Sequence, residues 1–246
     1  GLVQHPWVDL PGGTFRMGAD AGEGFPADGE GPPRDVRLRP FRIAATPVTN
    51  AQFAAFVRAT GYITQAEEAG ASFVFYLQVP QALRATIRQH PRGLPWWLEV
   101  RDTCWQRPEG PGSTVRERGD HAVVHVSWHD AQAYCRWAGV ALPTEAQWEY
   151  AARGGLDGQR YPWGDVMPAE PPCNIWRGDF PHAPADGWHP GTVGAGTYPP
   201  NGFGLDAMSG NVWEWCADWY TPLYHATTAA VEPLANEPTG RRASRG

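Results

Sequence analysis

Glycine and proline are spread along the whole sequence, and they limit the chain to short helices and strands. The 246 residues include 29 Gly and 25 Pro, residues that interrupt regular backbone. Large aromatic side chains must then fill much of the core, and 13 Trp are present for that purpose. The sequence therefore predicts an irregular α+β fold with little regular secondary structure. We expect a single domain over residues 1–246.

Three capping boxes predict helix starts. In each, a Ser or Thr cap is followed three residues later by a Gln or an Asp that can bond back to it. Each is followed by a helical apolar pattern and then by a glycine that ends it. The boxes begin at Thr49, Ser127 and Thr144, and the helices are predicted to end at Gly61, Gly139 and Gly154.

Short strands are predicted at 13–18, 123–128 and 212–215. In the last of these, alternation sends Trp213 and Trp215 to one face and Glu214 to the other. A buried glutamate needs a cation, an arginine or water as its partner. Three long stretches, 16–40, 90–120 and 154–210, carry turn residues and are predicted to be irregular.

The charge balance argues against a nucleic-acid partner. The formal net charge is −6, and no basic run is present. All 20 basic residues are arginine, a bias that indicates a GC-rich bacterial genome. No segment has the apolar length of a membrane span, so we expect no membrane partner and a cytoplasmic location.

Four widely spaced cysteines, without a CxxC pair, favour a reducing compartment over a disulfide framework. Cys135 adjoins the buried stripe of a predicted helix, and Cys216 lies within a tryptophan cluster. Both are expected to be structural.

Two groups of residues could bind a metal, and both patterns are weak. His121, His125 and His129 recur every four residues, but the valines between them favour a strand, so we interpret them as structural histidines. Oxygen donors at Asn174, Asp179, Asp186 and Glu214 suit calcium, although no EF-hand loop is present. Nucleophile-elbow, Walker and dinucleotide motifs are absent from the sequence.

The sequence resembles the formylglycine-generating enzymes, also called sulfatase-modifying factors, over essentially its whole length. The segments "SWHDAQAYCRWAG", "LPTEAQWEYAARGG" and "GNVWEW" are typical of the wider superfamily. The segments "AEEAGASFVF", "PWWLEV" and "WQRPEGP" are typical of the enzymes themselves.

The resemblance implies a fold related to C-type lectins and an oxidase acting on an unfolded sulfatase polypeptide. In the family, a cysteine within Cys-X-Pro-X-Arg becomes Cα-formylglycine. Molecular oxygen reacts at copper(I), which two cysteine thiolates hold. We expect a monomer.

The resemblance also implies two calcium sites and an active-site tryptophan. One site would use Asn174, Asp186 and the carbonyls of Ile175 and Trp188. The other would use Glu214 with the carbonyls of Gly210 and Val212, and Trp213 would line the active site. Where relatives often carry Asn or Asp, this chain has Ala207.

The family's substrate groove corresponds to Ala66, Ala71, Ser72 and Phe73. Relatives can place an aspartate at the position of Ala71, where it pairs with the substrate arginine. Glu67 or Glu68 could replace that carboxylate here, because arginine favours a bidentate acid partner.

The family's copper-binding cysteine pair belongs to a segment that would follow Gly246, and Cys135 matches a cysteine that, in secreted relatives, is bonded to that same segment. We therefore expect residues 1–246 to be a truncated, inactive form. Two alternatives remain: a non-catalytic paralogue or lectin-like peptide-binding module, and an iron-dependent sulfoxide synthase of the ergothioneine type. The last is disfavoured because no iron-binding helical domain precedes Gly1.

Overall fold

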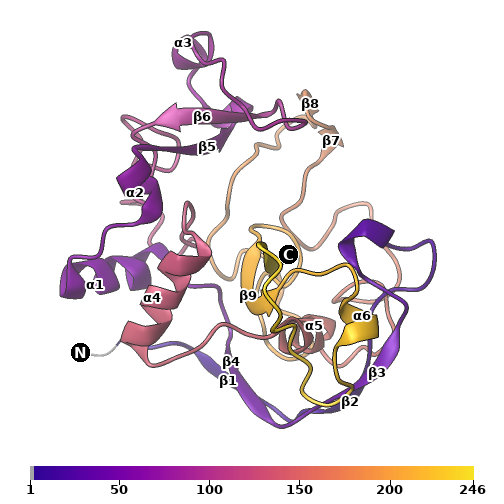
Figure 1. Cartoon of the computed structure of the whole chain (residues 1–246). Helices are drawn as coiled ribbons and strands as arrows, with labels where there is room; N and C mark the ends of the chain where they lie inside the picture. Colours follow the sequence, from indigo (N-terminus) through magenta and orange to yellow (C-terminus); the bar gives the residue numbers. More distant parts are fainter. Residues whose placement is uncertain (1–2) are drawn as a thin grey trace. The chain divides into compact units, whose positions relative to one another are not determined.

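The computed structural model describes residues 3–246, and these form two compact units. Unit 1 contains Val48–Ala138 and Asn174–Thr197, together with Val3. Unit 2 contains Gln4–Pro47, Gly139–Cys173 and Tyr198–Gly246. Each unit therefore joins segments that are distant in the sequence (Figure 1). The expectation of one domain over residues 1–246 stays a prediction.

Unit 1 is built from short helices and two antiparallel β-ribbons. Its elements are α1 (Asn50–Thr60), α2 (Gln65–Ala69), β5 (Ala71–Phe75), η2 (Tyr76–Gln78), α3 (Gln81–Arg84), β6 (Trp97–Arg101), α4 (Trp128–Ala138), β7 (Gly178–Asp179) and β8 (Ala183–Pro184). Strand β5 pairs with β6, and β7 pairs with β8. Helices α1 and α4 share an aromatic core in which Phe53, Phe56 and Tyr134 surround Trp105.

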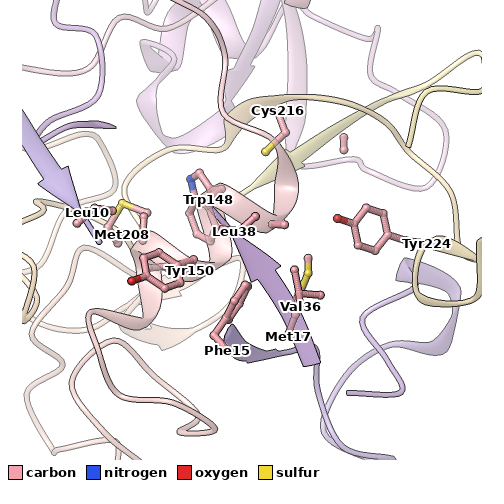
Figure 2. Packing of buried hydrophobic residues seen from close by; sticks show 14 of the residues in the cluster. Leu10, Phe15, Met17, Val36, Leu38, Trp148, Tyr150, Met208, Cys216 and Tyr224 are labelled. Carbon is pink, nitrogen blue, oxygen red and sulfur yellow. The ribbon is translucent and has the colours of Figure 1, made fainter. Parts of the chain in front are cut away.

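Unit 2 contains three antiparallel strand pairs and one long helix. Its elements are β1 (Trp7–Leu10), β2 (Gly13–Met17), η1 (Pro26–Asp28), β3 (Arg34–Leu38), β4 (Phe41–Ala44), α5 (Glu145–Arg153), β9 (Glu214–Trp219), α6 (Tyr224–Thr227) and β10 (Arg242–Arg245). Strand β1 pairs with β4, β2 with β3, and β9 with β10. Figure 2 shows the core, in which side chains from β2 and β3 pack with Trp148 and Tyr150 of α5.

Unit 2 also holds a network of largely buried charges. The Arg245 guanidinium donates from Nη2 to Glu149 at 2.7 Å and from Nη1 to Glu145 at 3.3 Å. Glu149 also accepts a bond from Arg153 Nη2 at 2.8 Å, and Arg245 lies 5.4 Å from the centre of the Trp148 ring. Buried carboxylates are tolerated when they are paired in this way. The network joins β10 to α5.

The three predicted helices are confirmed as α1, α4 and α5. Thr49 and Thr144 form complete capping boxes, and Ser127 exchanges equivalent bonds with Asp130 at 2.9 and 3.1 Å. Helix α2 was not predicted from sequence, although Thr64 and Glu67 form the same motif. Within residues 3–246, no helix is both long enough and apolar enough to cross a bilayer.

Of the three predicted strands, one is confirmed, one is wrong and one begins later than predicted. The prediction at 13–18 is confirmed as β2. The prediction at 123–128 is wrong, because His125 has a φ of 57°, which breaks an extended backbone. The strand predicted at 212–215 begins only at Glu214, because the Val212 amide donates locally to the Gly210 carbonyl at 3.0 Å. Strands β3 and β6 lie in stretches that were predicted to be irregular.

Candidate functional site

The four predicted substrate-binding residues lie on one continuous segment of unit 1, which we call the α2–β5 segment (Thr64–Phe75). Ala66 is on α2, whereas Ala71, Ser72 and Phe73 are on β5. Phe73 is 44% exposed. Strand β6 pairs with β5 and places Glu99 opposite Phe73. The segment thus presents an aromatic side chain to solvent from a paired, ordered strand.

The capping box of α2 distinguishes the two glutamates that were considered as partners for a substrate arginine. The Glu67 Oε2 atom accepts bonds from the Thr64 amide at 2.9 Å and from the Thr64 hydroxyl at 2.8 Å. Its carboxylate is therefore engaged in capping the helix. Glu68 is exposed on the same helix. Of the two side chains, Glu68 is the one whose carboxylate is available to a peptide.

Ser72 is fixed by a histidine that is distant in the sequence. His125 Nδ1 lies 2.7 Å from the Ser72 hydroxyl, and His125 Nε2 lies 2.7 Å from the carbonyl of Pro108. A carbonyl only accepts, so Nε2 carries the proton and Nδ1 accepts from the hydroxyl of Ser72. Burial lowers the pKa of His125, which keeps the ring neutral. His125 is thus a positioning residue for the α2–β5 segment.

Asp130 anchors the other end of this segment to α4. Its carboxylate is fully buried and accepts bonds from the Tyr62 hydroxyl at 2.8 Å and the Gln65 amide at 3.1 Å. Together with its bond to the Ser127 amide, these contacts supply the partners that a buried carboxylate requires. The sequence analysis assigned Asp130 only to a helix cap and His125 only to a structural role. His125 contacts Ser72, 53 positions away, and Asp130 contacts Tyr62, 68 positions away. Contacts over such separations cannot be predicted from neighbouring residues.

An aromatic cluster adjoins the end of β5. The ring of Phe75 lies 5.8 Å from Trp97, 5.7 Å from Trp176 and 6.2 Å from Phe180. Trp97 is 37% exposed and Phe180 is 52% exposed. Aromatic rings of this kind offer large contact areas at low entropic cost. With Phe73, they give unit 1 a surface suited to an extended peptide.

The predicted calcium ligands of unit 1 lie on the two arms of the β7–β8 ribbon. Gly178 pairs with Pro184, and the amide of Ala185 donates to the Arg177 carbonyl at 2.7 Å. The ladder ends there, because the Trp188 amide donates to the Ala185 carbonyl at 3.0 Å and places Asp186 in a turn. The Asn174 side chain is buried and donates from Nδ2 to the Gly191 carbonyl at 2.7 Å. Asp186 is exposed.

The predicted calcium ligands of unit 2 lie at the start of β9. The Glu214 carboxylate accepts a bond from Trp148 Nε1 at 3.0 Å, and burial raises the pKa of Glu214 to about 7. Gly210 and Asn211 both have positive φ values, 73° and 69°. They turn the chain immediately before the strand. Glu214 is partly buried and its donor, an indole N–H, is neutral, so its calcium site stays a prediction.

Trp213 and Ala207 flank this second set of ligands. Trp213 is 77% exposed, and its place in an active site stays a prediction. Ala207 has a φ of 53°, a conformation in which Asn and Asp are enriched relative to other non-glycine residues. The backbone here therefore suits Asn or Asp. The methyl group of Ala207 supplies no oxygen to a cation.

Within residues 3–246, no three His, Cys, Asp or Glu side chains form a metal-binding group. The calcium sites implied by the resemblance combine carbonyls with one or two side chains, so they stay predictions. His121 Nδ1 lies 2.8 Å from the Thr192 hydroxyl, and His125 is hydrogen-bonded through both ring nitrogens. These contacts agree with the interpretation of both as structural histidines.

The cysteines of residues 3–246 do not fit the copper site that the resemblance implies. All four are buried, and none forms a disulfide. Burial raises the pKa of the Cys135 thiol to about 11 and raises that of Cys216 well above its ordinary value. Copper(I) needs accessible thiolates. These four thiols are therefore unsuited to holding copper(I) as they lie in the fold.

Comparison with known proteins gives a consistent picture. The family model "Sulfatase-modifying factor enzyme 1-like domain" matches residues 4–246. The chain is 54% identical over 242 residues to the "Formylglycine-generating enzyme" of Streptomyces coelicolor, covering 97% of this chain and 77% of the relative. It is also 50% identical over 216 residues to the "Inactive C-alpha-formylglycine-generating enzyme 2" of Bos taurus, covering 87% of this chain and 70% of the relative.

Solved structures agree on the fold. PvdO from Pseudomonas aeruginosa matches with a TM-score of 0.60 and 26% identity, over 90% of this chain and 73% of that chain. The Treponema denticola variable protein 1 matches with a TM-score of 0.54 and 19% identity, over 99% of this chain and 84% of that chain.

Proposed function

Because the chain belongs to the sulfatase-modifying factor enzyme 1-like family, we propose that it serves the oxidation of a sulfatase cysteine to Cα-formylglycine. The observation that carries the proposal is the 54% identity, over 97% of the chain, to a protein named for that reaction. The substrate would be an unfolded sulfatase segment with the sequence Cys-X-Pro-X-Arg. Molecular oxygen would be the oxidant, as in the family.

The α2–β5 segment is the proposed peptide-binding surface. Phe73 offers an exposed ring, while Ser72 is oriented by His125. Glu68 supplies the carboxylate for the substrate arginine, because Glu67 is engaged in the cap of α2. Ala66 and Ala71 leave room for a peptide main chain beside these side chains.

Calcium is proposed as a structural cofactor at Asn174 and Asp186 and, separately, at Glu214. The charged and amide oxygens present are the ligand types that calcium prefers, and carbonyls of Ile175, Trp188, Gly210 and Val212 would complete the two sites. The neutral donor to Glu214 supports the second site. Calcium would brace loops that have few backbone pairings of their own.

Copper(I) is proposed for the family reaction but not at the cysteines described here. Since the thiols of residues 3–246 are buried, we expect residues 1–246 to bind the peptide without converting it. The wide spacing of the four cysteines supports a reducing, cytoplasmic location, and the arginine bias supports a bacterial source. A monomeric state stays a prediction.

A non-catalytic peptide-binding role is the second candidate. It is favoured by the 50% identity to a relative named as inactive and by the absence of an accessible thiol pair in residues 3–246. Both candidates share the peptide surface and differ in the chemistry. A single set of measurements can therefore test them together.

The experiment measures both binding and conversion of a Cys-X-Pro-X-Arg peptide by residues 1–246. We expect saturable binding, seen by fluorescence anisotropy, and no aldehyde by mass spectrometry when copper(I), oxygen and a reductant are supplied. Aldehyde formation would show that the assignment of the cysteines is wrong. Absence of binding would contradict the proposed substrate surface and, with it, both candidates.

Glu68→Gln tests the arginine contact. It should weaken binding by about two- to fivefold, the range of an exposed ion pair. Glu67→Gln is the matched control, because a glutamine at that position retains the capping box. Replacing the peptide arginine by citrulline should remove the difference between wild type and Glu68→Gln. Equal losses in the two variants would rule out Glu68 as the partner.

A further inference from the structure

Strand β5 of unit 1 has one edge that is paired and one edge that is not. It forms a two-stranded antiparallel sheet with β6, in which Phe73 lies opposite Glu99 (Figure 1). Within residues 3–246, no third strand joins this sheet. The outer edge of β5 therefore carries main-chain groups that β6 does not use.

The hydrogen bonds at the two ends of the sheet identify these outward groups. The Asp102 amide donates to the Gly70 carbonyl at 2.9 Å. At the other end, the Tyr76 amide donates at 2.9 Å to the carbonyl of the residue before β6. In an antiparallel pair, residues that bond to the partner strand alternate with residues that do not. Every second residue from Gly70 onwards thus faces β6, and the main chains of Ala71 and Phe73 face away from it.

The outward N–H and C=O groups of Ala71 and Phe73 have no hydrogen-bond partner within residues 3–246. Phe73 is 44% exposed, and Ala71 is half-buried. Main-chain polar groups of an ordered strand are almost always bonded. These groups are therefore left for water or for a bound chain.

The two strands of the sheet differ in how their outer edges are protected. On β6, the Glu99 amide donates to the Gln89 carbonyl at 3.0 Å, and Glu99 and Arg101 add charge. Strand β5 has the sequence Ala-Ser-Phe-Val-Phe. It lacks the charged residues and prolines by which proteins usually prevent the addition of another strand. An open edge of this kind suits an extended peptide.

We propose that the substrate segment binds as an added antiparallel strand on the outer edge of β5. This inference rests on the proposed function, because it takes Cys-X-Pro-X-Arg as the substrate. The first X residue lies opposite Phe73 and the second lies opposite Ala71, and each exchanges main-chain hydrogen bonds with its partner. The antiparallel direction brings the substrate arginine past Ala71 to the end of α2, where Glu68 is exposed. A parallel strand would carry the arginine away from Glu68.

This register accounts for the pattern of the substrate motif. The two X residues bond to β5, so the cysteine, the proline and the arginine, which alternate with them, do not. Proline lacks an N–H group and is tolerated in a strand where its nitrogen points away from the ladder. The side chains of the X residues lie on the same face of the sheet as Phe73 and Glu99, which are exposed. A main-chain contact leaves the identity of both X residues open.

Methylation of the peptide main chain tests the register. The parent peptide has Cys-Ala-Pro-Ala-Arg at its centre, and fluorescence anisotropy follows its binding to residues 1–246. A methyl group on the main-chain nitrogen of either alanine should weaken binding by at least about tenfold, because it removes a hydrogen bond and blocks approach to β5. The matched control is a methyl group on the main-chain nitrogen of the arginine, which points away from β5. It should change the affinity by less than about twofold. Equal effects at all three positions would overturn the register.

Hydrogen exchange of assigned amides tests the same contact from the protein side. Saturating peptide should slow exchange of the Phe73 amide by at least about tenfold and leave Val74, whose amide points to β6, unchanged. A parent peptide that does not bind would contradict the proposed function and this inference with it. A peptide that binds without protecting Phe73 would contradict only the strand addition. Protection of Phe73 that rises with protein concentration in the absence of peptide would show that a second copy occupies the edge, and the proposal would be wrong.

Discussion

His125 combines an unfavourable backbone conformation with two short hydrogen bonds. A φ of 57° is uncommon for a residue of this size, and the contacts to Ser72 and Pro108 hold it there. The neutral ring serves both bonds at once, one as acceptor and one as donor. Protonation would remove the acceptor and reverse this bond, so that Nδ1 donates to the Ser72 oxygen and the hydroxyl proton loses its acceptor.

This arrangement predicts a pH dependence with a definite sign. Burial lowers the pKa of His125 below 6.5 in the folded state. In the unfolded chain the ring takes up a proton near pH 6.5, while the folded protein does not. The free energy of unfolding should therefore fall as the pH drops below 6.5, by at most about 1.4 kcal/mol per pH unit for this group. At higher pH the contribution of His125 is constant.

His125→Gln removes the titration and keeps a donor and an acceptor. Urea unfolding at about pH 7.5 and 5.5 should show a weaker decline for the variant than for wild type. Other titrating groups, such as Glu145, whose pKa burial raises to about 7, are present in both proteins and cancel in the difference. Identical pH dependence of the two proteins would contradict a neutral, buried His125.

At the scale of elements, the ion pairs of Arg245 join β10 to α5. Arg245→Met should lower the free energy of unfolding by about 3 kcal/mol, because it leaves Glu145 and Glu149 buried with less compensating charge. Denaturant unfolding measures the loss. Arg42→Met is the control, since Arg42 pairs with Asp9 at 2.8 Å on the surface, and such pairs contribute less than about 1 kcal/mol. Similar losses in both would contradict a stabilising role for the buried network.

The elements that could be predicted from sequence are those specified by neighbouring residues. Capping boxes span four positions, which is why α1, α4 and α5 were correct and why the Thr64 box of α2 was available to find. Strand pairing depends on distant segments, so β3 and β6 were missed. The alternation around Glu214 correctly indicated that this glutamate needs a partner. The indole of Trp148, 66 residues away, had no local signal.

The candidate site was predicted from sequence to the same limited extent. The resemblance placed Ala66, Ala71, Ser72 and Phe73 on what proves to be one segment. The groups that orient it, His125 and Asp130, are joined to it only by the folded structure. The sequence alone does not distinguish Glu67 from Glu68 as the partner of a substrate arginine, because both carry the same charge one residue apart. The cap of α2, which engages Glu67, distinguishes them.

At the scale of the whole molecule, the two units have separate cores, and each contains one proposed calcium site. Binding calcium only in the folded state should add about 2.7 kcal/mol of stability per site when free calcium is a hundredfold above the dissociation constant. EDTA should therefore lower the melting temperature of residues 1–246. An unchanged melting temperature would contradict both sites.

Two variants assign this response to the two units. Asp186→Asn should remove calcium-dependent protection from hydrogen exchange in 174–188 of unit 1, and Glu214→Gln should remove it in 207–219 of unit 2. In EDTA, Glu214→Gln should be as stable as wild type or more stable, because burial already disfavours the charged form of Glu214 and raises its pKa to about 7. Asp20→Asn, an exposed acid outside both sites, controls for a general effect of charge. The two losses of calcium-dependent protection should add, because the two sites share no ligand. If either variant removed protection from both units, calcium would couple the units, which would contradict separate stabilisation of each.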